Sequence, residues 1–242
     1  MRKTLALAIL ALLTATAIPK KIEAQEQFVE AGYTTKTVLT SGFTPIDNWS
    51  FYTAYGQNFE NWSFDIRANW DLEKRKGVQE VDFNFSFPLI RTDLINTDLY
   101  AGYFIFPNSD YDNPKERSYY DGLEAALIIS TSELPVNIDL YVAHFRYERG
   151  ENGNIVKGRI RKSFNVTRNF STEVFGRIVY NNEYFNSSSG FSHSQTGLNL
   201  TLSSENISVT GSLTYQHALN KETFGDMFMN QTYGGLSAKF KF

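Results

Sequence analysis

Apolar and polar residues alternate with a period of two along most of the chain after residue 28. In the stretch from Trp62 to Trp70 every second residue is apolar, and the residues between them include Asp65 and Arg67. The stretch 80–89 repeats this arrangement. Such alternation is typical of β-strands with one apolar and one polar face. Because a soluble sandwich would not turn charges toward its core, the pattern favours a barrel with lipid outside and water inside.

Turn-forming residues separate twelve runs of this kind, and an even number suits a closed barrel. At about 3.3 Å per residue and a tilt near 40°, the run from Trp62 to Trp70 spans roughly 20 Å of membrane normal. The predicted fold is all-β, a closed antiparallel transmembrane β-barrel of about twelve strands. The runs lie near residues 28–40, 49–58, 61–71, 78–89, 97–106, 118–130, 136–147, 155–164, 170–181, 192–202, 207–216 and 231–242.

The connectors between these runs alternate between short and long. With both chain ends on the periplasmic side, the short connectors fall on that side and the long ones outside. The stretch 90–96 is an exception, a long connector on the short side. The short set is 59–60, 131–135, 165–169 and 203–206, and the long set, rich in Asn, Asp, Ser and Gly, is 108–117, 148–154, 182–190 and 217–230.

Three tryptophans stand at the ends of predicted strands. Trp62 and Trp70 begin and end one run, and Trp49 opens the run before it. The tetrapeptide Asn-Trp-Ser-Phe occurs at both Trp49 and Trp62. Because Trp favours the boundary between membrane and water, we expect all three as interface anchors rather than as a sugar-stacking motif.

The chain ends in an alternating run, Leu236-Ser-Ala-Lys-Phe-Lys-Phe242, with Phe240 and Phe242 on one face. This ending resembles the C-terminal sorting signal of bacterial single-chain outer-membrane proteins, although Ser237 stands where a glycine is common. The resemblance implies an outer-membrane location and a last strand that pairs with the first. It also implies that the barrel-assembly machinery recognises Phe240 and Phe242, and that lipid and lipopolysaccharide surround the barrel.

The first 24 residues have the layout of a secretory signal peptide. Arg2 and Lys3 precede the apolar stretch 5–13, and we expect cleavage after Ala24, with Ala17 as the alternative site. The apolar stretch is about half of the roughly 20 residues that a membrane-spanning helix needs, and no later segment approaches that length. The predicted division is a signal peptide, residues 1–24, and one barrel domain, residues 25–242.

Composition narrows the possible partners. Removal of residues 1–24 takes four basic residues and one acidic residue from totals of 23 and 26, which leaves a net charge near −6. This acidic balance argues against a nucleic-acid partner. The chain has no cysteine, which excludes disulfides, thiolate metal sites and a lipidated N-terminal cysteine, and its three scattered histidines form no metal-ligand set. We therefore expect no metal and no cofactor.

Charged residues of both signs lie on the polar face of the runs, and the two signs segregate around the wall. A segregated wall creates a transverse field that orients polar solutes and tunes ion selectivity. The alternative is an interior closed by ion pairs among Asp139, Arg159, Arg161, Glu173 and Arg177. A twelve-stranded barrel fits either interpretation. The predicted pore-lining residues are Asp65, Arg67, Glu80, Asp82, Glu124, Asp139, Lys157, Arg159, Arg161 and Arg177.

A search for enzymatic chemistry finds one neighbourhood of interest. Outer-membrane lipid hydrolases carry a His-x-Ser pair on one strand face, in which the His activates the Ser. Here the residue two positions after His193 is Gln195, which cannot be a nucleophile. Ser192 and Ser194 are adjacent to His193 and are expected on the opposite face. The sequence therefore predicts that the protein is not an enzyme, and a lipid hydrolase is the least favoured alternative.

The segment between Gly122 and Tyr147 contains Gly-Leu-Glu-Ala-Ala-Leu followed by Leu-Pro-Val-Asn-Ile-Asp-Leu-Tyr. This layout resembles TorF-type porins, but it is too generic to assign a family. The predicted architecture of an outer-membrane barrel favours a passive porin-like channel for small polar or charged solutes. Because a fold does not fix a function, the alternative is a non-conducting barrel with a structural, adhesion or binding role through its outer loops. The sequence leaves the solute and the oligomeric state open.

The ending predicts a specific defect when Phe242 is changed to Ser. Assembly into the outer membrane should fall while export continues, because the terminal aromatic marks the strand that closes the barrel. Outer-membrane abundance and heat-modifiable gel mobility measure this directly. Lys239→Ser, on the polar face of the same run, is the control and should assemble normally. Normal abundance of the Phe242→Ser protein would refute the assignment.

Overall fold

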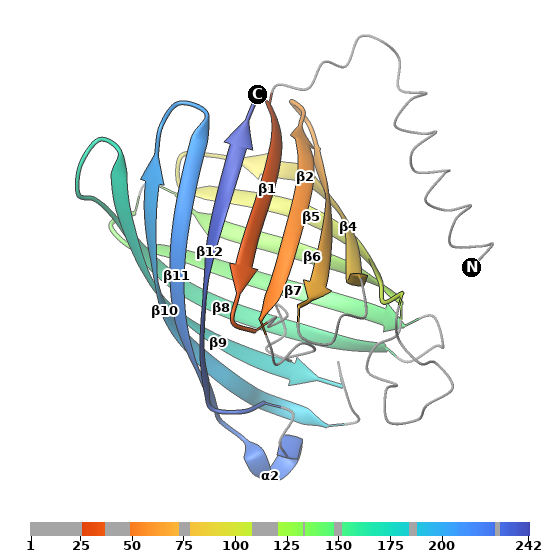
Figure 1. Cartoon of the computed structure of the whole chain (residues 1–242). Coiled ribbons are helices and arrows are strands. Elements are labelled where there is room, and N and C mark those ends of the chain that lie inside the picture. The colour runs from red at the N-terminus through yellow and green to blue at the C-terminus, as the bar shows by residue number, and fades with distance from the viewer. Residues whose placement is uncertain are drawn as a thin grey trace, which may run out of the picture.

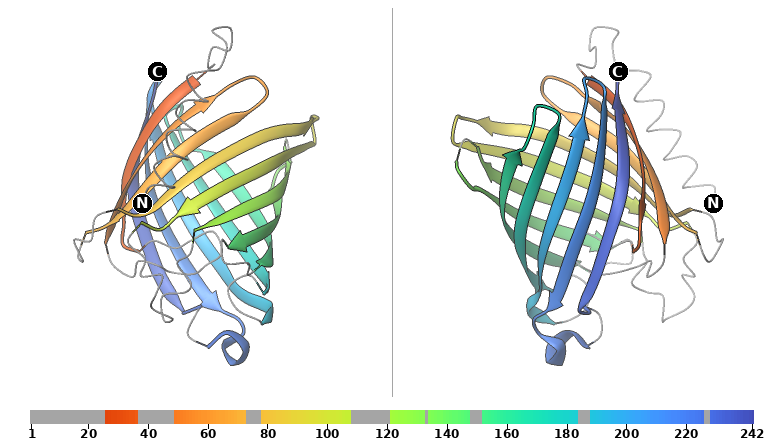
Figure 2. Two further views of the ribbon diagram at one scale, coloured as in Figure 1. Left: turned by 90° about the vertical axis from the view of Figure 1, so that its right-hand side faces the viewer. Right: turned by 60° about the vertical axis from the view of Figure 1, so that its left-hand side comes forward.

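The chain forms one closed antiparallel barrel (Figure 1, Figure 2). The computed structural model describes residues 26–36, 49–72, 78–107, 121–132, 134–147, 152–183, 188–225 and 228–242. Within these ranges twelve strands follow each other around the wall, and β1 pairs with β12, as the sequence predicts. The strands are β1 (Glu26–Thr34), β2 (Ser50–Asn58), β3 (Ser63–Asp71), β4 (Val78–Arg91), β5 (Ile95–Ile105), β6 (Gly122–Thr131), β7 (Asn137–Tyr147), β8 (Asn152–Asn165), β9 (Phe170–Asn182), β10 (Ser189–Ser203), β11 (Ile207–Ala218) and β12 (Gln231–Lys241).

The two ends of the barrel differ. We call the end that carries Glu26, Lys241 and the connectors 59–62, 92–94, 132–136, 166–169 and 204–206 the turn rim. The opposite end, the loop rim, carries Thr34, Tyr147, Asn182 and the four-residue helix α2 (Lys221–Phe224), which lies at the bottom of Figure 1. The predicted signal peptide, residues 1–24, lies outside the described residues and stays a prediction.

The connector between β4 and β5 is shorter than the sequence predicts. The stretch 90–96 was expected as a long connector, but β4 runs to Arg91 and β5 begins at Ile95. The remaining turn is closed by Thr92, whose backbone N–H donates to the Ile95 carbonyl at 3.0 Å. The β4–β5 register shifts between Pro88 and Ile90. Because proline cannot donate to a ladder, a bulge accommodates it, and β4 continues beyond the point where the pattern alone ends it.

The outer face of the barrel is apolar. The β3–β4 register sets Phe64 opposite Phe85 and Ile66 opposite Phe83, and the rings of Phe64 and Phe85 lie 6.2 Å apart. On the other side of the barrel, Leu213 and Leu236 are exposed. A continuous apolar exterior of this kind is stable in lipid rather than in water.

Aromatic residues gather where the strands end. Trp62 lies at the turn rim, just before β3, and its ring stacks on Phe59 at 4.2 Å. Trp70 lies at the other end of β3, and its ring is 5.7 Å from that of Phe51. Trp49 is exposed beside the first residue of β2 at the loop rim. All three lie at the rims of the barrel, and their role as membrane-interface anchors stays a prediction.

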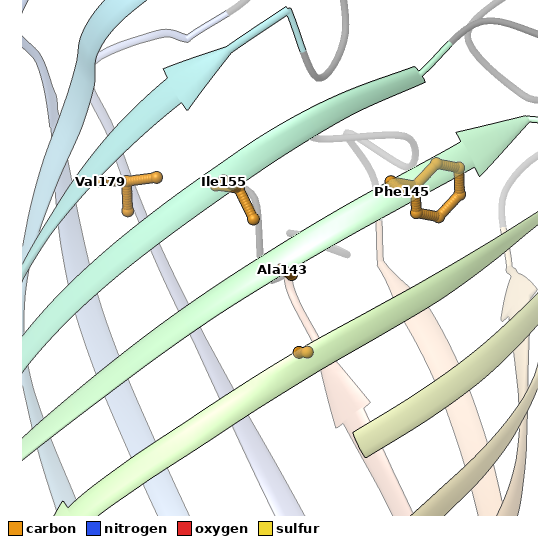
Figure 3. Close-up of a cluster of buried hydrophobic side chains, with 5 residues drawn as sticks. Ala143, Phe145, Ile155 and Val179 are labelled. Carbon is orange, nitrogen blue, oxygen red and sulfur yellow. The ribbon is translucent and has the colours of Figure 1, made fainter. Parts of the chain in front are cut away.

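The interior is partly filled by apolar side chains. Ala126, Ala143, Phe145, Ile155 and Val179 form a buried cluster on the inner face of β6 to β9 (Figure 3). This part of the inner face lies toward the loop rim. No helix within the described residues is long and apolar enough to cross a membrane.

The facing of β11 can be tested with two arginine substitutions at neighbouring positions. Gly211→Arg places a charge on the lipid face and should cost about 2 to 4 kcal/mol near the bilayer midplane. A side chain at Gly211 meets no atom within 4 Å, so a clash would not explain the loss. Ser212→Arg points into the interior from an exposed position and should cost much less. Urea unfolding in lipid vesicles measures both.

Gly211→Ala is the matched control and should leave the free energy of unfolding nearly unchanged. If Ser212→Arg is the more damaging of the two arginine changes, the facing of β11 is reversed.

Candidate functional site

The candidate site is the inner face of the barrel, which carries all of the predicted pore-lining residues. The register sets Arg67 opposite Asp82 and Asp139 opposite Arg159 on this face. The ten residues come from β3 (Asp65, Arg67), β4 (Glu80, Asp82), β6 (Glu124), β7 (Asp139), β8 (Lys157, Arg159, Arg161) and β9 (Arg177). Their role as the lining of a conduction path stays a prediction.

Glu30 and Lys239 are among the inner-face charges that were not predicted as pore-lining residues. Glu30 on β1 lies opposite Lys239 on β12, across the seam where the barrel closes. The same alternation that identified the other positions places both residues on the polar face, since Lys239 stands between Ala238 and Phe240. The signal was therefore present in the sequence.

We call the inner face of β1 to β6 the acidic wall, because Glu30, Asp65, Glu80, Asp82 and Glu124 outnumber Arg67 there. Three of these carboxylates accept hydrogen bonds from neighbours: the Tyr52 hydroxyl donates to Glu30 at 2.6 Å, the Asn84 amide to Asp65 at 2.9 Å and the Asn69 amide to Glu80 at 2.9 Å.

Two neighbouring carboxyl groups of the acidic wall are buried. Glu80 is 3% exposed and Asp82 is 8% exposed, and Asp82 Oδ1 accepts no hydrogen bond from the described residues. The Arg67 guanidinium stands over the Tyr52 ring at 3.9 Å, and the register sets it opposite Asp82. Because burial and a neighbouring carboxyl group both disfavour a charged carboxylate, the negative potential of this wall depends mainly on its less buried members, Glu30 and Asp65, and Arg67 offsets part of it.

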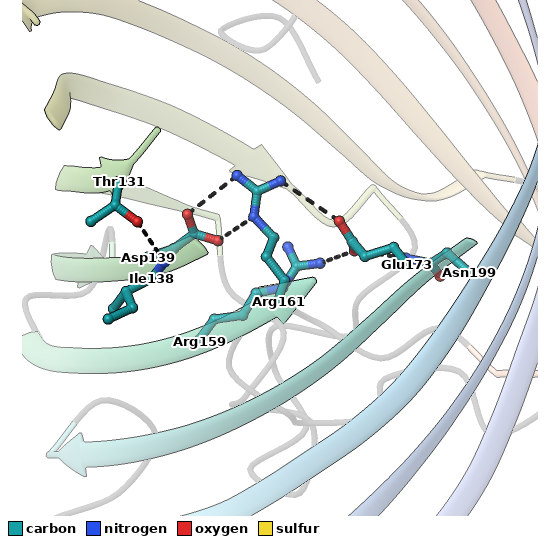
Figure 4. A network of polar contacts seen from close by, with 7 residues as sticks. All are labelled: Thr131, Ile138, Asp139, Arg159, Arg161, Glu173 and Asn199. Carbon is teal, nitrogen blue, oxygen red and sulfur yellow. Dashed lines mark hydrogen bonds and ion pairs between the residues drawn. The ribbon is translucent and has the colours of Figure 1, made fainter. Parts of the chain in front are cut away.

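We call the inner face of β8 and β9 the basic wall, because Lys157, Arg159, Arg161 and Arg177 lie on it. An ion-pair network joins part of it to β7 (Figure 4). Arg161 Nε donates to Asp139 at 2.9 Å, and Arg161 Nη1 lies 3.6 Å from Glu173. Arg159 also pairs with Glu173, and the Asn199 amide donates to the same carboxylate at 3.2 Å.

The sequence left open whether these charges line a path or form ion pairs. Of the five residues considered as ion-pair partners, the structure joins Asp139, Arg159, Arg161 and Glu173. Arg177, which the register sets opposite Arg159, forms no ion pair within the described part of the chain. The basic wall therefore has a compensated part near the turn rim and an uncompensated part deeper in the barrel.

The expected facing of Ser192 is wrong. A bulge between Phe191 and His193 inserts Ser192 as an extra residue in β10, so Ser192 and His193 no longer lie on opposite faces. Ser192 Oγ lies 2.9 Å from His193 Nδ1, and both residues are buried. His193 Nε2, however, has no hydrogen-bond partner in the described structure, so no carboxylate orients the ring. The pair lacks the third group that a hydrolase triad needs.

The segment after β11 covers this part of the inner face. The Phe228 ring stacks on His193 at 5.1 Å and is 1% exposed, and Phe224 of α2 meets Phe228 at 5.3 Å. The Gln216 amide donates to the Met229 carbonyl at 3.3 Å. Side chains of this segment therefore cover the inner face beside β10 and β11 at the loop rim.

Comparisons with known proteins place this architecture. Neither the scan against protein-family models nor the search of curated proteins finds a match. Among solved structures, the KdgM porin has a TM-score of 0.59 at 8% identity, covering 89% of this chain and 99% of that chain. The NanC porin has a TM-score of 0.55 at 10% identity, covering 89% and 100%.

An outer-membrane channel from Pseudomonas putida F1 has a TM-score of 0.53 at 10% identity, covering 93% of this chain and 99% of that chain. Because these identities are low, the likeness establishes the fold alone. The chain shares the closed antiparallel barrel of outer-membrane porins and channels.

Proposed function

We propose that this protein is a passive outer-membrane channel for small polar or charged solutes. The observation that carries the proposal is the division of one barrel wall into an apolar outer face and an inner face with charges of both signs. Charged residues on an inner face are stable where water fills the interior. The similar structures, which include two porins and an outer-membrane channel, support the same assignment.

The charge layout indicates how such a channel treats a solute. The acidic wall on β1 to β6 and the basic wall on β8 and β9 face each other across one interior, so a transverse field acts on whatever passes between them. A dipolar solute aligns with this field and so lies across the pore, with its positive end toward the acidic wall. Ions of either sign meet an attractive wall, and the balance between the walls sets the selectivity.

The side chains that cover the inner face beside Phe228 limit the expected conductance. Side chains near the turn rim, such as Arg161 and Glu173, are partly exposed, whereas His193 and Gln216 nearer the loop rim are fully buried. Twelve strands also enclose less space than the sixteen of large porins. We therefore expect a channel whose resistance lies on the loop-rim side.

A non-conducting barrel is the second candidate, and a specific observation favours it. The network of Asp139, Arg161 and Glu173 lies along the inner face of β7 to β9, and the apolar cluster around Ile155 covers another part of this face. Interior ion pairs and close packing are the features by which small barrels close their interiors. Such a barrel would serve as an anchor or as a binding surface.

Single-channel recording in a planar lipid bilayer separates the two candidates. The channel proposal predicts discrete conductance steps that are smaller than those of a sixteen-stranded porin recorded in the same salt. Phe228→Ala should increase the step, because it removes the ring that covers His193. Folded protein, verified by heat-modifiable mobility, that gives no steps in either form would refute the channel and leave the non-conducting barrel.

Selectivity supplies a second measurement on the same recordings. Replacement of Arg159, Arg161 and Arg177 by Gln should shift the reversal potential in a salt gradient toward cations, because the acidic wall then dominates. Lys162→Gln removes one positive charge from the outer face of the same strand and should leave the potential unchanged. An unchanged potential in the triple variant would show that ions do not pass these arginines.

A further inference from the structure

The positive charges of the basic wall divide into two pairs. Arg159 and Arg161 share the carboxylates of Asp139 and Glu173, so each has a partner of opposite charge within the network of Figure 4. Two carboxylates therefore compensate two guanidiniums. The remaining two cations of the wall, Lys157 and Arg177, take no part in this network.

Lys157 and Arg177 form no ion pair and no hydrogen bond within the described residues. Their contacts are with aromatic rings: Lys157 Nζ lies 3.4 Å from the centre of the Tyr141 ring, and the Arg177 guanidinium lies 5.9 Å from that of Phe175. Such contacts hold a cation in place and offset part of its loss of hydration, but they bring no negative charge.

The register places these two cations close together. Lys157 lies opposite Val179 and Arg177 opposite Arg159, so Lys157 and Arg177 are diagonal neighbours on the inner face. Diagonal side chains of paired strands start about 7–8 Å apart, within reach of one bridging group for side chains of this length. A third cation, Arg159, lies opposite Arg177, and its Nε has no hydrogen-bond partner among the described residues.

Burial makes this arrangement costly without a ligand. Lys157 is only 5% exposed, and like charges directly opposite each other, as in the pair of Arg159 and Arg177, destabilise a sheet. The charge of Glu124, on β6 two strands away from β8, offsets part of this cost at Lys157. A negatively charged group bound between the two cations would offset the cost.

We propose that Lys157 and Arg177 form a binding site inside the barrel for a small oxyanion, a carboxylate or phosphate group. The Arg177 fork matches the two oxygens of either group, and the Lys157 ammonium supplies a second positive charge from the neighbouring strand. The site lies inside the barrel, along the proposed solute path. The proposal therefore rests on that path being open to solutes. A channel with such a site retains anionic solutes in passage.

Binding can be measured without conduction, on the folded protein in detergent micelles at constant ionic strength. Line broadening of inorganic phosphate in ³¹P spectra and of ¹³C-labelled glucuronate in ¹³C spectra detects weak binding of each group. We expect the protein to bind at least one of the two, and Arg177→Gln to weaken that binding at least fivefold. Lys157→Gln is the second variant and should act in the same direction.

Lys239→Gln is the matched control, because Lys239 is also an inner-face cation over an aromatic ring, 3.6 Å from that of Phe28, but lies opposite Glu30. It should leave binding unchanged. Absence of binding by folded protein, full affinity in both Arg177→Gln and Lys157→Gln, or an equal loss in Lys239→Gln would overturn the site. Binding without conductance in planar bilayers would refute the channel and support the site. Conductance without binding would refute the site and support the channel.

Discussion

The pairing of β1 with β12 is the contact on which the rest of the structure depends. Seven residue pairs join the two strands, from Phe28 opposite Lys241 to Thr34 opposite Gly235. Beyond them, the Phe242 N–H donates to the Gln27 carbonyl at 3.0 Å. In lipid each unpaired backbone group costs several kcal/mol, so an open sheet with two free edges would not be stable there. The last residues of the chain therefore stabilise the whole wall.

Closure also separates the two environments that decide where each residue lies. Once β1 and β12 are joined, every position faces either the outside or the interior, and the period of two sorts the side chains between them. Leu236 and Phe240 go to the apolar face, and Lys239 between them goes to the interior. The same sorting collects carboxylates on one side of the interior and guanidiniums on the other, which creates the transverse field.

The number of strands, their facing and the separation of the charges could be predicted from the sequence, because a period of two projects directly onto the two faces of a sheet. The prediction failed at bulges. One at Pro88 lengthened β4, and one at Ser192 moved a hydroxyl to within 2.9 Å of a His193 ring nitrogen. A bulge adds one residue and shifts the phase of the alternation, a change that the small and polar residues around Ser192 do not reveal.

Two features of the interior needed the three-dimensional register. Ile155 and Val179 lie on the inner face, where the pattern predicts polar residues, and they pack together because the neighbouring strands bring them to one level. The distinction between the paired Arg161 and the unpaired Arg177 depends on diagonal neighbours across two strands. A sequence states which face a residue takes but not the level at which it meets its neighbours.

The central claim is that a water-filled interior and a lipid-facing exterior alternate residue by residue along one wall. Because the chain has no cysteine, single cysteines can test it on β12 at Ser237, which faces the interior, and at Ala238, which faces outward. Both substitutions change few atoms. In proteoliposomes, a charged, membrane-impermeant thiol reagent should label Ser237→Cys rapidly and Ala238→Cys hardly at all. Equal labelling of the two positions, or faster labelling of Ala238→Cys, would contradict the account.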